Sequence, residues 1–181
     1  MGRFVALLRG VNVGGAKRVP MAEWRALLGT LGCTEAETLL NSGNAVFTSR
    51  IRSTATLAQR IRESLQQGLK VDVPVIVKTA DEFVAIEADN ELASPELDPS
   101  RLLVAFAAAT KDLQALADLS DLVRAPEKLW AGTQALYLWC PEGIRQSRAA
   151  EALLGRRGQA LTTRNWGTVT KIGALLRAPC G

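Results

Sequence analysis

Arg101-Leu102-Leu103-Val104-Ala105-Phe106-Ala107 is an apolar run of strand length in the middle of the chain. It has the same character as Phe4-Val5-Ala6-Leu7-Leu8 near the beginning. Between them, residues 90–100 contain two prolines, three acidic residues and little periodicity, as expected at a boundary. The sequence therefore predicts two halves with similar architecture, residues 1–95 and residues 96–181.

The first half alternates strand and helix patterns in a fixed order. Apolar residues at helical spacing predict helices, and short apolar runs beside turn residues predict strands. The predicted elements are strand 4–8, a helix from Pro20 to residue 31, a hairpin of residues 38–40 and 45–48, a helix around residues 57–65, strand 73–78, and a helix opened by the capping box Thr79-Ala80-Asp81-Glu82. This order is β-α-β-β-α-β followed by an extra helix.

The second half repeats this order. Its predicted elements are strand 101–107, a helix around residues 113–117, a hairpin of residues 123–130 and 135–139, helix 147–154, strand 160–163, and a last helix through residue 176. The fold class is therefore α+β, with two ferredoxin-like (βαββαβ) halves, each followed by an extra helix. In such a sheet the strands, numbered along each half, have the spatial order 4-1-3-2. From this order we expect the loop after the first strand and the turn at residues 42–44 to lie at opposite ends of the sheet.

Composition excludes several classes of function. The chain has 181 residues, 48% of them hydrophobic and 22% charged, and it contains no histidine. Without histidine, Ser-His-Asp, Cys-His and zinc-hydrolase chemistries are excluded. Three cysteines without close spacing are typical of a reducing compartment. No apolar stretch approaches the roughly 20 residues that span a bilayer. We therefore predict a cytoplasmic protein without membrane contact, metal site or cofactor.

A glycine-rich loop follows the first strand and is a candidate anion site. Residues 9–18 contain three glycines, among them Gly14 and Gly15, together with Arg9, Asn12, Lys17 and Arg18. Backbone N–H groups freed by glycine, together with a helix start, can hold an anion, and the basic side chains add positive charge. The alternative is that these glycines only permit tight turns.

The segment Thr163-Arg164-Asn165-Trp166-Gly167-Thr168-Val169-Thr170-Lys171 joins the last predicted strand to the last helix. Arg164, Asn165 and Lys171 could donate hydrogen bonds to a phosphate or a carboxylate. Capping of the helix by Asn165 or a nearby threonine would explain the same residues without a ligand.

Three segments together are similar to a known family. They are Arg9-Gly10-Val11-Asn12-Val13-Gly14-Gly15 with Pro20-Met21, then Asn41-Ser42-Gly43-Asn44, and the segment 163–171. In this order they resemble the bacterial family numbered 1697 among the domains of unknown function. The resemblance implies two ferredoxin-like parts and supplies no activity. The chain has Asn41 where the family usually has Gln, and Gly167 where it usually has Asn.

Three functional hypotheses remain open. The first is a module that binds an anionic ligand, either a phosphate-containing small molecule such as a nucleotide, or the backbone of a nucleic acid. The second is a small enzyme that works without histidine and uses Lys17, Lys171 or a carboxylate for proton transfer. The third is a scaffold or interaction domain without a ligand. Exposed aromatic side chains at Tyr137 and Trp139 would favour RNA.

Overall fold

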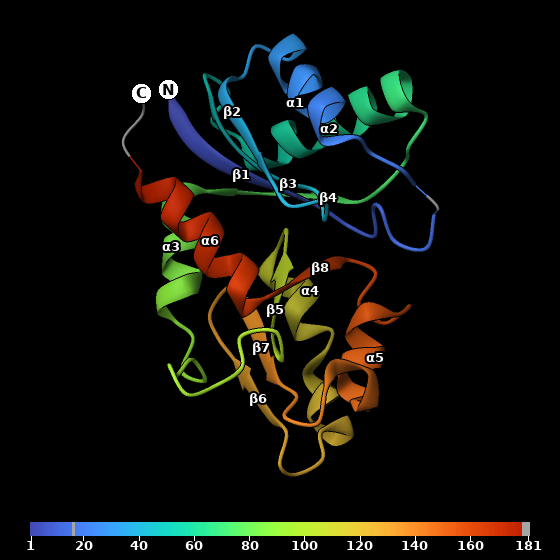
Figure 1. Cartoon of the computed structure of the whole chain (residues 1–181), viewed down its shortest axis with the longest axis vertical. Coiled ribbons are helices and arrows are strands. Elements are labelled where there is room, and N and C mark those ends of the chain that lie inside the picture. Colours follow the sequence, from blue (N-terminus) through green and yellow to red (C-terminus); the bar gives the residue numbers. More distant parts are fainter. Residues whose placement is uncertain (16, 179–181) are drawn as a thin grey trace. The chain divides into compact units, whose positions relative to one another are not determined.

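The computed structural model describes residues 1–15 and 17–178, and it divides the chain into two compact units (Figure 1). One unit contains Met1–Phe83 together with the segment that starts at Ala174, and the other contains Val84–Gly173. The sequence-based boundary between residues 95 and 96 stays a prediction. Within the described residues, no helix has the length and apolar character needed to cross a membrane.

The first unit follows the predicted element order. Its elements are β1 (Gly2–Leu8), α1 (Met21–Thr30), β2 (Thr34–Leu39), β3 (Asn44–Ser49), α2 (Thr54–Leu69) and β4 (Val75–Thr79), followed by α3 (Ala80–Ala88). Neighbouring strands are antiparallel and have the order β2-β3-β1-β4, so the predicted 4-1-3-2 order is confirmed. The capping box at the start of α3 also forms, because Thr79 N donates to Glu82 Oε2 at 2.8 Å and Glu82 N donates to Thr79 Oγ1 at 3.1 Å.

One face of this sheet is covered by α1 and α2 (Figure 1). Residues at spacing four on α2, namely Leu57, Ile61 and Leu65, are at most 1% exposed. Trp24 on α1 is fully buried in the same cluster. Full burial of one such side chain contributes about 1.5–3 kcal/mol, so this cluster stabilises the unit strongly.

The second unit repeats the plan, and the α+β fold with two ferredoxin-like halves is confirmed. Its elements are β5 (Leu102–Ala107), α4 (Thr110–Gln114), the 3-10 helix Ala117–Leu122, β6 (Lys128–Ala131), β7 (Ala135–Trp139), the 3-10 helix Ile144–Gln146, α5 (Arg148–Leu154), β8 (Leu161–Asn165) and α6 (Trp166–Arg177). The strand order is β6-β7-β5-β8. β6 is shorter than the predicted strand 123–130. Pro126 explains this, because proline cannot donate a hydrogen bond to a strand ladder.

Side chains of the β6–β7 hairpin satisfy carbonyl groups at the end of α3. Tyr137 donates its hydroxyl to the oxygen of Ile86 at 2.6 Å, and Trp130 Nε1 donates to the oxygen of Asp89 at 3.2 Å. The last carbonyl oxygens of a helix have no hydrogen-bond partner within the helix, and a buried oxygen without a partner is unfavourable. The two side chains supply the missing hydrogen bonds. Burial raises the pKa of Tyr137, which keeps its hydroxyl a donor. Because Tyr137 is fully buried, it cannot stack on a base.

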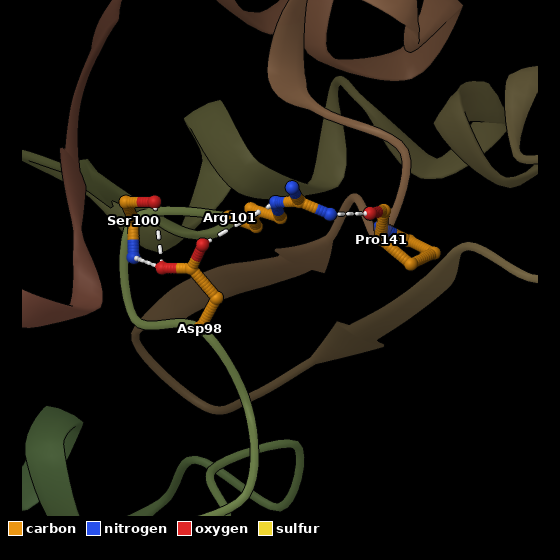
Figure 2. Close-up of polar contacts among 4 residues, drawn as sticks. All are labelled: Asp98, Ser100, Arg101 and Pro141. Atoms are coloured by element: carbon orange, nitrogen blue, oxygen red, sulfur yellow. Dashed lines mark hydrogen bonds and ion pairs between the residues drawn. The ribbon is translucent and has the colours of Figure 1, made fainter.

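The segment between α3 and β5 is joined to the loop after β7 by a polar network (Figure 2). Asp98 Oδ1 accepts hydrogen bonds from the N–H of Ser100 at 2.9 Å and from its hydroxyl at 2.7 Å. These bonds hold the pKa of Asp98 below its usual value. Arg101 lies beside Asp98, with Nε 3.3 Å from Oδ2, and donates to the oxygen of Pro141 in the loop after β7 (Figure 2). The predicted interruption of the periodicity is therefore an ordered series of turns.

Candidate functional site

The glycine-rich loop and the β2–β3 turn meet at the same end of the first sheet. Leu8 N donates to the oxygen of Gly43 at 2.9 Å, and the strand register pairs Leu7 with Asn44. The prediction that loop and turn lie at opposite ends is therefore wrong, although the strand order behind it is right. Because β1 and β3 are antiparallel neighbours, the end of β1 lies beside the beginning of β3.

Asn12 joins the two segments through its side-chain amide. Its nitrogen donates to the main-chain oxygens of Val19 at 3.0 Å and Asn41 at 2.7 Å, and its oxygen accepts from Val19 N at 2.8 Å. The backbone of Asn12 has φ 57°, in a region that asparagine tolerates better than most residues. Asn12 thus positions the loop, because both of its amide hydrogens and its oxygen are already used within the protein.

An open pocket of about 480 Å³ lies where the loop, the turn and the start of α1 converge. Its lining residues are Asn12, Gly15, Arg18, Val19, Pro20, Met21 and Asn41. Pro20 precedes α1, and no side chain caps the first N–H groups of this helix. The pocket therefore combines a guanidinium group, helix N–H groups without a side-chain cap, and an apolar wall of Val19, Pro20 and Met21.

The predicted loop residues are placed differently around this pocket. Gly14 and Gly15 have φ 62° and 79°, and at both the space where a Cβ would lie is free of the described residues beyond their chain neighbours. Their backbone is therefore accessible, and Gly15 lines the pocket. Arg9 is half-buried, and this burial lowers the pKa of its guanidinium group.

Lys17 is exposed and is not part of the pocket lining. Its charge instead contributes to the low pKa of Asp72, which is set mainly by the hydrogen bond from Arg62 Nε at 2.6 Å. Arg18 lines the pocket in its place. Lys17 has φ 52°, so the chain turns sharply there, and spacing alone could not show which of the two adjacent basic side chains would reach the pocket.

The other three predicted site residues belong to the second unit. Arg164, on β8, is 7% exposed and donates to Thr162 Oγ1 at 2.9 Å and to the oxygen of Thr163 at 2.7 Å. Burial lowers the pKa of Arg164 to about 10. Asn165 Oδ1 accepts from Thr168 N at 2.9 Å, so its predicted capping of α6 is confirmed. Lys171 is exposed on α6.

A ligand role for Arg164, Asn165 and Lys171 therefore stays a prediction. Within residues 1–15 and 17–178, no group of three or more Cys, Asp or Glu side chains is arranged to hold a metal ion. The pocket residues absent from the predicted site residues are Arg18, Val19, Pro20, Met21 and Asn41, although Arg18 lies in the loop that was predicted to bind the anion. Pro20, Met21 and Asn41 were visible as signals, because they lie in the segments that carry the family resemblance.

We expect Asn12→Asp to lower the free energy of unfolding by about 2 kcal/mol. A carboxylate cannot donate to the oxygens of Val19 and Asn41, and it brings a negative charge next to both of them. Unfolding in urea, followed by circular dichroism, measures the loss.

Asn41→Asp is the matched control for this change. It adds the same charge beside the pocket but keeps the hydrogen bond, because Asn41 accepts through its main-chain oxygen. Equal stability of the two variants would contradict the positioning role of Asn12.

Comparison with known proteins agrees with this architecture. The model of a family described as "Protein of unknown function (DUF1697)" matches residues 1–137. A solved structure, that of conserved bacterial protein SP0830 from Streptococcus pneumoniae, is 29% identical in sequence and superposes with a TM-score of 0.79. The superposition covers 97% of this chain and 99% of that chain. No curated protein matches the sequence.

Proposed function

Because the chain belongs to the DUF1697 family of proteins of unknown function, we propose a function from its site: it binds a small phosphate-containing ligand in the pocket at Arg18. The observation that carries this proposal is the convergence, in one pocket, of Arg18, Gly15 and the start of α1. The cavity volume of about 480 Å³ falls within the range of typical small-molecule sites, about 300–1,000 Å³.

The backbone supplies donors that suit phosphate oxygens. The first N–H groups of α1 have no partner within the helix, and the helix dipole adds positive potential at this end. In the preceding loop, Gly14 and Gly15 have positive φ, and Gly15 lines the pocket. Concave groups of backbone N–H donors of this kind bind anions in many proteins.

Charge and shape favour a phosphate ester over a free inorganic anion. Arg18 provides a planar group that can make two parallel hydrogen bonds to phosphate. Glu23 in the first turn of α1 is the nearest acid along the chain, and it does not line the pocket. The wall of Val19, Pro20 and Met21 offers apolar contact to the organic part of a ligand.

The test is isothermal titration with inorganic phosphate and AMP, together with thermal unfolding, at low and at physiological salt. A ligand at 100 times its dissociation constant stabilises the folded state by about 2.7 kcal/mol, which gives a clear shift of the midpoint. We expect AMP to bind more tightly than inorganic phosphate, and we expect affinity to fall as salt is added.

Arg18→Ala should weaken AMP binding about tenfold or more, because it removes a charge-assisted hydrogen bond worth about 1.5–3 kcal/mol. Arg25→Ala is the matched control: this arginine is exposed on α1 and does not line the pocket. No titration signal with the unmodified protein, or equal binding by the two variants, would overturn the proposal.

A further inference from the structure

A second, smaller pocket lies within the unit Val84–Gly173. Its volume is about 250 Å³. The segment after α3 contributes Glu91, Leu92, Ser94 and Leu97, while Lys128 comes from β6 and Trp139 from β7. Lys128 and Trp139 are directly paired across the β6–β7 ladder, so the two strands present an ammonium group and an indole side by side. The pocket is thus built from a turn segment over the end of a hairpin.

Two opposite charges line this pocket without neutralising each other. Among the described residues, neither the Glu91 carboxylate nor the Lys128 ammonium group forms an ion pair or a side-chain hydrogen bond. Both side chains are exposed, so both groups are open to a ligand. A ligand that carries one positive and one negative group could pair with both at once.

The remaining lining is apolar. Trp139, Leu92 and Leu97 are half-buried and offer an indole face and two isobutyl groups. Aromatic and aliphatic surfaces of this kind hold an apolar side chain through burial and dispersion contacts. The volume is below that of typical drug-sized sites, which favours a small ligand.

The segment that forms one wall is held in place. Asn90 Oδ1 accepts from Leu92 N at 3.1 Å, and Leu97 N donates to the oxygen of Ser94 at 3.1 Å. At its far end, Asp98, Ser100 and Arg101 form a polar network in which Arg101 donates to the oxygen of Pro141 in the loop after β7 (Figure 2). A wall that is ordered in advance reduces the entropy that a ligand must overcome.

An unsatisfied donor lies next to this wall in the chain. Asn90 is 7% exposed, and its amide nitrogen has no hydrogen-bond partner among the described residues. A buried donor without a partner is unfavourable by about 1–3 kcal/mol and calls for an explanation. Asn90 does not itself line the pocket, so this donor forms no part of the proposed site.

We propose that this pocket binds a free amino acid with an apolar side chain. The ligand's α-carboxylate pairs with Lys128, its α-ammonium group pairs with Glu91, and its side chain packs on Trp139. Nucleic acid does not suit the pocket, because Glu96 and Asp98 add further negative charge to the same segment. The site is separate from the pocket at Arg18, and the proposal does not depend on phosphate binding there.

The test uses L-leucine, L-leucinamide, which lacks the carboxylate, and N-acetyl-L-leucine, which lacks the ammonium group. Binding is followed by titration calorimetry and by the fluorescence of the tryptophans, with Trp139→Phe identifying the signal that comes from the pocket. We expect leucine to bind with a dissociation constant on the order of 1 mM and each analogue to bind about tenfold more weakly.

Charge-removing variants assign each contact. Glu91→Gln should weaken leucine binding about tenfold and leave N-acetyl-leucine binding nearly unchanged. Lys128→Gln should weaken leucine binding about tenfold and leave leucinamide binding nearly unchanged. Glu96→Gln and Lys111→Gln are matched controls, since both residues are exposed in the same unit and neither lines the pocket.

The proposal is overturned by any of three results. One is no saturable binding of leucine up to about 10 mM, tenfold above the expected dissociation constant. Another is equal affinity for leucine and both analogues in the unmodified protein, a measurement that needs no variant to fold. The third is leucine binding by Glu91→Gln and Lys128→Gln that equals that of the two controls.

Discussion

Gly43→Ala is expected to lower the free energy of unfolding by about 3 kcal/mol. A Cβ at this position would lie 2.7 Å from the Cβ of Leu8 and 2.8 Å from Cγ2 of Val11. Both neighbours are at most 2% exposed in the core of the first unit, so neither can move aside freely. The backbone of Gly43 also has φ 79°, which is strained for a residue with a side chain.

Gly14→Ala separates the two causes. Gly14 has a similar backbone, with φ 62°, but no heavy atom of the described residues beyond its two chain neighbours lies within 4 Å of the position of its Cβ. Its replacement should lower the free energy of unfolding by about 1 kcal/mol, from backbone strain alone. Urea unfolding of both variants at 25 °C measures the difference, and equal losses would show that the contact with Leu8 and Val11 is not tight in solution.

The same substitution also tests the link between the turn and the pocket. The oxygen of Gly43 accepts from Leu8 N, and Asn41 two residues earlier lines the pocket. A displaced turn therefore changes the shape of the site. We expect Gly43→Ala to weaken AMP binding more than Gly14→Ala does, when both are compared at a temperature where both are folded.

Gly158→Ala is expected to lower the free energy of unfolding by about 3 kcal/mol or more. A Cβ here would lie 1.9 Å from the main-chain oxygen of Leu153 and 2.7 Å from its carbonyl carbon. These atoms belong to the last turn of α5, and Leu153 is 1% exposed in the core of the second unit. Relief of the clash requires a shift of backbone, and that shift breaks the bond from Gly158 N to the oxygen of Ala152.

Gly29→Ala serves as the control of opposite sign. Gly29 lies within α1, and the space at its Cβ position is open. Alanine should therefore stabilise the protein by about 0.5–1 kcal/mol, because glycine is the weaker helix former. A Gly158→Ala protein that unfolds at the same urea concentration as the unmodified protein would contradict the close approach to α5.

The elements and their order could be predicted because they depend on short stretches of chain. Spacing of four placed Leu57, Ile61 and Leu65 on one helix face, and all three are buried. The capping box at Thr79 and the cap at Asn165 also form, because each is made by residues only three positions apart. Helical periodicity and capping hydrogen bonds involve only residues that are close together in the chain, so the sequence alone shows them.

The candidate site was predicted only in part. The loop at residues 9–18 was recognised from its glycines and basic residues, and Gly15 does line the pocket. Arg18 rather than Lys17 reaches it, because the left-handed backbone at Lys17 decides where each side chain points. Asn165 caps α6 and Arg164 is buried, so both side chains are already engaged within the protein.

By itself, the sequence determined the fold class, the element order, the strand order and the absence of histidine chemistry. Only the tertiary structure decided that the loop after β1 and the turn before β3 form one pocket. Asn12 and Asn41 are 29 positions apart, and Gly43 and Leu8 are 35 positions apart, yet each pair is in contact. The strand order brings these segments to one end of the sheet, while the individual atoms that meet there depend on loop conformations that no local pattern encodes.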